Sequence, residues 1–228
     1  CTPSRGLGDV YKRQALIFPV EEICKIAKSR GIITIIDGAH APGHIDLDIS
    51  KIGCDYYTGA CHKWMCAPKG SSFLYVAKNF QKGMSPQIMS WGEKGDDPGP
   101  SQFLMDFQWQ GTKDMSAFLA IPSAIKFLQK NKWKEKSVIS KNLISHLAGS
   151  LKDILGTESL FKNKNWIGQM ISHPLPTDTP VNLKDMLWND FKIEVPIFDW
   201  GKRNFIRVSA HFYNDQKDMD HLIKALKE

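Results

Sequence analysis

The sequence predicts an α/β protein in two parts: a mainly parallel sheet with flanking helices, followed by a small C-terminal α/β unit. One observation is an amphipathic helical pattern over residues 19–31 that leads directly into the apolar run IITIID at residues 32–37. Continuously apolar, β-branched runs are typical of strands buried on both faces in a parallel sheet. The other is a long amphipathic helical pattern at residues 135–155, after which strand and helix patterns alternate again.

The first helix carries clear start and stop signals. Pro19 stands at a first-turn position, Glu21 and Glu22 follow it, and Gly31 ends the pattern. Proline and acids are favoured in the first turn of a helix, and glycine is favoured just past its end. We therefore expect a helix that packs on the strand directly after it.

A second cycle of the same kind follows. The patterns predict a short acid-capped helical turn and two further strands, at residues 45–53 (IDLDISKIG), 54–60 (CDYYTGA) and 71–77 (SSFLYVA). Pro68 and Gly70 predict a turn between the last two strands. These elements complete the expected first sheet.

The middle and the end of the chain supply the remaining elements. Residues 83–111 are rich in Gly, Pro, Ser and Asp and predict a long irregular stretch; its aromatic residues favour a functional loop. Residues 116–131 predict one helix with Pro122 inside it. The last part predicts two strands and two helices, in chain order strand, helix, strand, helix, at residues 168–175, 182–191, 204–212 and 216–228.

The expected domain organisation has three segments. Residues 1–14 (CTPSRGLGDVYKRQ) show neither helical nor strand periodicity, and we interpret them as a non-native junction such as translated adaptor sequence. Residues 15–130 then form the first domain. Residues 131–228 form a small C-terminal α/β domain that includes a bridging helix.

Composition narrows the class of protein. With 42% hydrophobic and 24% charged residues in 228, the chain is typical of soluble globular proteins, and no apolar run approaches the length of a membrane span. The five cysteines, an odd number without disulfide-like spacing, favour a reducing cytoplasm. The net charge is +6, but the lysines are scattered along the chain and interleaved with acidic residues. This argues against a nucleic-acid partner.

Two residues follow expected strands and point to chemistry. Asp37 ends the apolar run, and Lys63 lies 26 residues further along, about one strand-helix-strand unit. Ligands in open α/β sheets sit beyond the carboxyl ends of the strands. A lysine and a carboxylate in one crevice suit a pyridoxal phosphate site, where the amine bonds to the cofactor and the acid keeps its ring nitrogen protonated. The spacing alone leaves open a capping aspartate and a solvated loop lysine.

Three other kinds of site fit the same region less well. Metal-ligand types are present, but HAPGH does not fit a helix-borne pair and no paired CxxC unit exists; the residues are His40, His44, Cys61, His62 and Cys66. PKGSS at residues 68–72 has its lysine before the glycine, so it is no nucleotide P-loop. Cys61 and Cys66 lie near His62 and could serve as nucleophiles, but a buried structural cysteine is the commoner case.

Four stretches in order carry a resemblance to a known family: DGAHAPG at 37–43, DYYTGACHKWMCAPKGSSFLYV at 55–76, WQGTKD at 109–114 and IRVSAHFYN at 206–214. Together they resemble the class V aminotransferase family of fold-type I pyridoxal phosphate enzymes, closest to the isopenicillin N epimerase-like branch. The resemblance runs from Ala15 to about residue 220. It implies that residues 15–130 are the C-terminal part of the cofactor-binding large domain.

The resemblance implies roles for four residues around pyridoxal 5'-phosphate. Lys63 would be the Schiff-base lysine and would move the proton at the substrate α-carbon. Asp37 would pair with the pyridine nitrogen. His40 stands where the family has His or Gln near the phenolic oxygen, and His62 would help to hold the phosphate.

Two further roles concern the substrate and a second subunit. Arg207 would clamp the α-carboxylate of an amino acid substrate, for which a guanidinium fork is suited. Thr112 would reach the phosphate of the other subunit's cofactor, which implies a homodimer. Taken singly, Arg207 could equally be an exposed strand arginine and Thr112 a helix cap.

The sequence also departs from the family pattern. Ala60 replaces a polar residue that supports the phosphate in many relatives, and Ser72 replaces a common glycine. The upstream half of the large domain, with its phosphate loop and ring-stacking aromatic residue, is missing, so we expect an N-terminally truncated fragment.

The expected function is that of a pyridoxal phosphate enzyme acting at the α-carbon of an amino acid, by transamination or epimerisation. Kynureninase-type or lyase-type cleavage and a cofactor-free dimerisation module are the alternatives. No cysteine follows Cys66, which argues against desulfuration through a persulfide on the usual loop.

Overall fold

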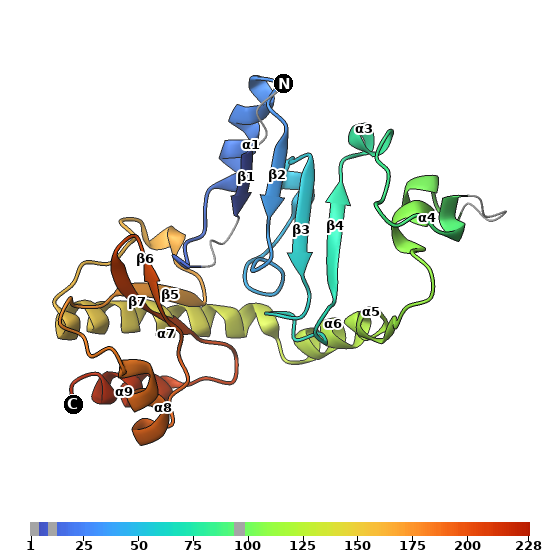
Figure 1. Cartoon of the computed structure of the whole chain (residues 1–228). Helices are drawn as coiled ribbons and strands as arrows, with labels where there is room; N and C mark the ends of the chain where they lie inside the picture. The colour runs from blue at the N-terminus through green and yellow to red at the C-terminus, as the bar shows by residue number, and fades with distance from the viewer. Residues whose placement is uncertain (1–4, 9–12, 94–98) are drawn as a thin grey trace.

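The first sheet has four strands and is covered by helices on one face. The computed structural model describes residues 5–8, 13–93 and 99–228 (Figure 1). The strands follow the order β1-β2-β3-β4, with bounds β1 Arg5–Gly8, β2 Thr34–Asp37, β3 Tyr56–Ala60 and β4 Ser72–Val76. The first three are parallel, and β4 is antiparallel to β3. The mainly parallel sheet predicted from the sequence is confirmed. β4 is joined to β3 by residues 61–71, which contain no helix and are too short for the crossover that a parallel neighbour requires.

Helices α1 (Val20–Ser29) and α2 (Ile49–Ile52) pack on the first sheet. Asp48 caps α2, since its carboxylate accepts hydrogen bonds from the backbone N–H groups of Ser50 and Lys51. The core beneath the helices is built from side chains of both layers, among them Val20, Cys24, Ile36, Ile52 and Tyr57. The predicted first helix and acid-capped turn are both confirmed.

Among the described residues, the opposite face of the first sheet is partly open, so the prediction that residues 32–37 are buried on both faces was wrong. Ile36 is 1% exposed, but its neighbour Ile35 is 40% exposed. Leu74 of β4 is 45% exposed. Because alternate residues of a strand face opposite sides, a continuously apolar run does not reveal that only one side is covered.

β1 comes from the segment that sequence reasoning left without structure. Its backbone runs parallel to β2, with Arg5 opposite Thr34 and Gly8 opposite Asp37. The expectation of an irregular segment was therefore wrong for these four residues. Residues 1–4 and 9–12 lie outside the described part, and the non-native origin of residues 1–14 stays a prediction.

The middle of the chain is more helical than expected. The elements here are α3 Lys78–Gln81, η1 Trp91–Glu93, α4 Gln102–Gln108, α5 Ser116–Leu119 and α6 Ile121–Lys130. The prediction of a wholly irregular stretch at 83–111 was wrong, because Ser101 caps α4 through its hydroxyl. The single helix predicted at 116–131 is two helices. Pro122 lies in the first turn of α6, where proline is tolerated, and not in a helix interior, where it is not.

The long helix α7 (Trp133–Leu155) connects the two halves of the molecule. Figure 1 shows α6 under the lower ends of β3 and β4, and α7 extending from there along the second sheet. Ile144, Leu147 and Leu151 are fully buried, as the predicted apolar face requires, whereas Val138 is 57% exposed. We keep the domain division at residues 130 and 131 as a proposal, since it falls in the link between α6 and α7.

The second sheet has three antiparallel strands in the order β5-β7-β6. The elements of this half are η2 Lys164–Trp166, β5 Met170–Pro174, α8 Leu183–Phe191, β6 Ile197–Trp200, β7 Arg203–Ser209 and α9 Gln216–Ala225. Sequence reasoning missed β6. The sheet shares one apolar core with α7, α8 and α9, in which Leu147, Leu187, Ile206 and Leu222 are buried.

Candidate cofactor site

Asp37 and Lys63 leave neighbouring parallel strands at one edge of the first sheet, as their spacing predicted. Asp37 is the last residue of β2 and lies opposite Thr58 in β3. Lys63 follows β3 by three residues and is half-buried in a turn. The carboxyl ends of parallel strands are where open α/β sheets bind ligands.

Two glycines shape the loop after Asp37. The backbone N–H of Gly38 still bonds to the carbonyl of Thr58, at 2.8 Å, and a Cβ there would lie 2.1 Å from the ring of Tyr57. Gly43 has φ +78°, and a Cβ on it would meet the Trp64 carbonyl carbon at 2.6 Å. The Asp37 carboxylate is exposed and accepts a hydrogen bond from the Ala39 N–H at 3.1 Å.

The turn that carries His62 and Lys63 is closed by backbone hydrogen bonds. The Cys66 N–H bonds to the Lys63 carbonyl at 3.1 Å, and the Ala67 N–H bonds to the Cys61 carbonyl at 3.1 Å. His62 Nδ1 lies 2.9 Å from the carbonyl oxygen of Ser71. Because a carbonyl only accepts, this nitrogen carries the proton, and Nε2 of His62 is the acceptor in the neutral ring.

Trp64 joins the Lys63 turn to the loop after Asp37. Its indole Nε1–H donates to His40 Nδ1 at 3.2 Å. Its ring stacks on His44, with centroids 4.3 Å apart and planes at 23°. His40 and the turn of Lys63 are therefore brought together by the residue directly after the lysine.

The second sheet reaches the same point through His211, two residues after β7. The His211 ring stacks on Trp64 with centroids 5.8 Å apart, and Nε2–H donates to the Trp64 carbonyl at 3.1 Å. Sequence reasoning missed Trp64 and His211, and weighed His44 only as a metal ligand. The signals were an aromatic residue beside the lysine and a histidine just beyond an apolar strand.

Burial sets the charge state of this cluster. The pKa of His44 falls from 6.5 to about 3, mainly through burial and in smaller part through the neighbouring imidazoles of His40 and His211. The pKa of His211 is also lowered by burial, partly offset by its bond to the Trp64 carbonyl. Both rings are neutral at physiological pH.

Arg207 and Thr112 come from other segments of the chain than these loops. Arg207 is half-buried in β7, between the buried Ile206 and Val208, and burial lowers the pKa of its guanidinium. Arg207 is four positions before His211, so the Cα atoms of the two residues are about 14 Å apart at most. Thr112 is exposed after α4, and the structure does not join it to the other predicted residues.

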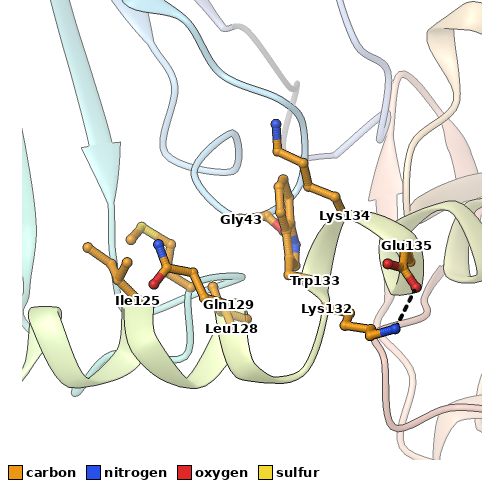
Figure 2. A pocket seen from close by; sticks show the side chains of 9 residues that line it. Gly43, Ile125, Leu128, Gln129, Lys132, Trp133, Lys134 and Glu135 are labelled. Carbon is orange, nitrogen blue, oxygen red and sulfur yellow. Dashed lines mark hydrogen bonds and ion pairs between the residues drawn. The ribbon is translucent and has the colours of Figure 1, made fainter.

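A pocket of about 530 Å³ lies below the two loops, between them and the junction of α6 with α7. Figure 2 shows Trp133 and Lys134 projecting from the start of α7 toward the loop that carries Gly43. Trp133 Nε1–H donates to the Gly43 carbonyl at 2.6 Å. Gly43 and Met65 line the pocket, but Asp37 and Lys63 do not.

Two features are absent from the described residues. No helix in that part of the chain is long and apolar enough to cross a membrane. Among the same residues, no group of three or more His, Cys, Asp or Glu side chains lies where it could hold a metal ion.

Comparison with known proteins decides the family. The family model described as aminotransferase class-V matches residues 15–222. The chain belongs to the class-V aminotransferase family. The cofactor of this family is pyridoxal 5'-phosphate. The resemblance stated from the four motifs is thereby confirmed.

Class-V relatives support the expected branch. Isopenicillin N epimerase of Amycolatopsis lactamdurans is 35% identical over 96% of this chain and 58% of its own length, and that of Streptomyces clavuligerus is 34% identical over 95% and 58%. L-cysteine desulfhydrase of Arabidopsis thaliana is 26% identical over 97% and 53%. The chain thus spans little more than half the length of these relatives.

Solved structures share the class-V fold. A cysteine desulfurase from Thermococcus onnurineus NA1 superposes with a TM-score of 0.83 at 21% identity, over 98% of this chain and 59% of that one. A cysteine desulfurase of Escherichia coli gives 0.78 at 17% identity, over 98% and 58%. The predicted fold, part of a fold-type I large domain followed by a small α/β unit, is confirmed.

The residues present in this class-V chain fit the cofactor. A carboxylate at the end of β2, an imidazole in the loop after it and an amine in the turn after β3 offer a partner for a pyridine nitrogen, a phenolic oxygen and an aldehyde. The two loops are held against each other by Trp64 and Gly43.

Proposed function

We propose that the protein is a pyridoxal phosphate-dependent enzyme that acts at the α-carbon of an amino acid, as an aminotransferase or epimerase. The observation that carries the proposal is Lys63 beside the Asp37 strand, at one sheet edge, in a class-V chain. Similarity to two isopenicillin N epimerases favours proton transfer at the α-carbon.

The chemistry is divided between the cofactor and the residues of the chain. When bound, the cofactor supplies a conjugated ring that withdraws electron density from the substrate α-carbon. The amine of Lys63 would hold the cofactor covalently and, once the amine of the substrate has taken its place, would carry the proton to and from that carbon. The negative charge of Asp37 keeps the pyridine nitrogen protonated.

The two histidines and Thr112 orient the cofactor. His40 faces the phenolic oxygen. His62 uses Nε2 toward the phosphate, since its Nδ1–H is held by the Ser71 carbonyl. Thr112 contacts the phosphate of a second subunit, so the enzyme is a homodimer. Its exposed position agrees with a contact outside its own chain.

Arg207 binds the substrate. A guanidinium forms two parallel hydrogen bonds with a carboxylate, and this fixes the orientation of an amino acid as well as its position. The half-buried position of Arg207 strengthens such a pair, because water competes less for either partner. We place the enzyme in the cytoplasm, in agreement with the thiols of Cys61 and Cys66, which are not joined in a disulfide.

A lyase that cleaves a bond beyond the α-carbon is the second candidate. It is supported by similarity to L-cysteine desulfhydrase of Arabidopsis thaliana and to hercynylcysteine sulfoxide lyase of Schizosaccharomyces pombe, at 26% and 25% identity. Incubation with alanine and with cysteine separates the two candidates. Exchange of the α-hydrogen of alanine with solvent supports the first candidate, and release of sulfide from cysteine supports the second.

Titration with pyridoxal phosphate tests the central assignment. We expect a visible absorption band that borohydride removes, leaving the pyridoxyl group on Lys63 in peptide mass spectra. Lys63→Ala abolishes the band. Lys69→Ala, an exposed lysine in the same turn region, keeps it. No band at saturating cofactor, together with no binding in equilibrium dialysis, would favour a cofactor-free dimerisation module instead.

A further inference from the structure

Three aromatic side chains from separate parts of the fold meet directly beside Lys63. His44 comes from the loop after β2, Trp64 follows the lysine, and His211 follows β7. All three are buried, with exposed fractions of 4%, 7% and 5%. We call this stack of His44, Trp64 and His211 the histidine joint.

Hydrogen bonds fix each ring of the histidine joint as well as the stacking does. His44 Nε2 accepts from the backbone N–H of Gln169 at 2.7 Å, and the Gln169 side-chain amide donates to the His44 carbonyl at 3.0 Å. Gln169 directly precedes β5, and its own carbonyl accepts from the Ala210 N–H. The loop after β2 is therefore tied to two strands of the second sheet.

The tie at Trp64 acts on its backbone. His211 Nε2–H donates to the Trp64 carbonyl, while the indole N–H of Trp64 donates to His40. The Cα atoms of Lys63 and Trp64 are about 3.8 Å apart across one planar peptide. A shift of the Trp64 backbone therefore moves the point from which the Lys63 side chain extends.

There is little room for the histidine joint to relax. A Cβ on Gly168 would lie 2.3 Å from His44 Nε2, and a Cβ on Gly43 would lie 2.6 Å from the Trp64 carbonyl carbon. Tyr213 stacks on the outer side of His211, with centroids 5.2 Å apart. The histidine joint therefore has close neighbours at the His44 ring, at the Trp64 backbone and at the His211 ring.

We propose that His211 and His44 are positioning residues for Lys63: through the histidine joint, the second sheet sets where the lysine amine lies at the carboxyl edge of the first sheet. The proposal deepens the proposed function and rests on the role given there to Lys63. It also places Arg207 and Lys63 relative to each other, because β7 carries Arg207 and leads into His211.

The decisive test is a pair of substitutions that differ only in reach. In His211→Gln, the terminal amide nitrogen lies where Nε2 was and can donate to the Trp64 carbonyl. In His211→Asn, the amide nitrogen lies at the Nδ1 position and cannot reach it. The readout is the rate of acetylation of Lys63 relative to Lys69 as a function of pH, from peptide mass spectra of the 228-residue chain, without cofactor.

We expect His211→Asn to change the Lys63 rate ratio, or to displace its pH profile, by about threefold or more, which is within the range of couplings carried by packed networks. His211→Gln keeps the profile of the parent chain. His44→Leu, which removes the bond to Gln169, changes it as His211→Asn does. His221→Asn, in the exposed part of α9, leaves it unchanged.

A Lys63 profile that is the same in His211→Asn, His211→Gln and the parent chain would overturn the proposal. Circular dichroism melting shows which variants are folded. If His44→Leu is unfolded, the comparison of His211→Asn with His211→Gln decides the test. Failure of the proposed function gives a different result. In that case Lys63 acquires no pyridoxyl group, although its acetylation profile still responds to His211.

Discussion

Folding makes the His44 ring harder to protonate. Its ring is buried against Trp64 and faces His40 and His211, so the charged form is disfavoured and the pKa falls from 6.5 to about 3. In the unfolded chain the same ring takes up a proton near pH 6.5. The difference makes the stability of the fold depend on pH.

We predict that acid destabilises the chain through His44. Between pH 6.5 and pH 3 the unfolded state binds a proton that the folded state does not, so the free energy of unfolding falls by about 1.4 kcal/mol for each unit of pH decrease. His44→Gln, whose side-chain oxygen can still accept from the Gln169 N–H, removes this part of the slope. Urea unfolding at several pH values measures it.

The exposed histidine of α9 gives the matched control for the acid effect. His221→Gln makes the same chemical change at a surface position, and we expect the slope of stability against pH to stay as in the parent. Equal slopes in His44→Gln and the parent chain would show that His44 is protonated in the folded state near its ordinary pKa.

The predictable residues were those whose role follows from chain order. Asp37 and Lys63 could be assigned to one sheet edge because strand ends and parallel order are visible in the sequence. Trp64 and His211 could not be joined, since they are 147 positions apart and meet only through the packing of the two sheets. The partners of His44 were hidden for the same reason.

At the scale of elements, α7 shows how an amphipathic pattern is used. One stripe of the helix, with Ile144, Leu147 and Leu151, is fully buried in the core of the second sheet. Its first turns project beyond that core, and Val138 and Ile139 are more than half exposed there. The second half of the helix is therefore anchored in the core of the second sheet, and its first turn is held to the Gly43 loop by Trp133.

We predict that the two halves of α7 respond differently to truncation. Leu147→Ala removes a side chain with no exposure and should lower the free energy of unfolding by about 2–5 kcal/mol. Val138→Ala removes an exposed side chain and should change it by less than about 0.5 kcal/mol. Chemical denaturation measures both. Similar losses for the two would mean that the first turns of α7 are packed as well.

Most helices and strands could be predicted from the sequence. The points at which a helix is interrupted were harder to predict. Capping and periodicity found α1, α7 and α9, because their signals are local. The strand β6 was missed, since IFDW is short and its face is set by pairing with β7. The helix predicted at 116–131 is divided near Pro122, because this proline lies in the first turn of α6 and not inside one continuous helix.

At the scale of the whole molecule, one face of the first sheet remains uncovered among the described residues. Ile35 and Leu74 point to it, and β4 is an edge strand that pairs only with β3 there. Exposed apolar edge strands are templates for pairing with other chains. The open face was not predictable, because the apolar run at 32–37 looks the same whether one or both sides are covered.

We predict that this face makes the chain self-associate. Leu74→Lys places a charge on the exposed edge strand and should lower the weight-average mass seen by sedimentation at high protein concentration, since lysine on an edge opposes pairing. Val181→Lys adds the same charge at a fully exposed position far from the sheet and should leave the mass unchanged. Equal masses for both variants and the parent would contradict the prediction.

The course of β7 has a thermodynamic consequence. The strand carries Arg207 and ends two residues before His211, whose ring is bonded to the residue after Lys63. Under the proposed roles, a carboxylate held by Arg207 and a bond formed at Lys63 are linked equilibria. If carboxylate binding at Arg207 changes the equilibrium constant at Lys63 by some factor, bond formation at Lys63 changes the affinity for the carboxylate by the same factor. Substrate affinity would then report on the state of the lysine.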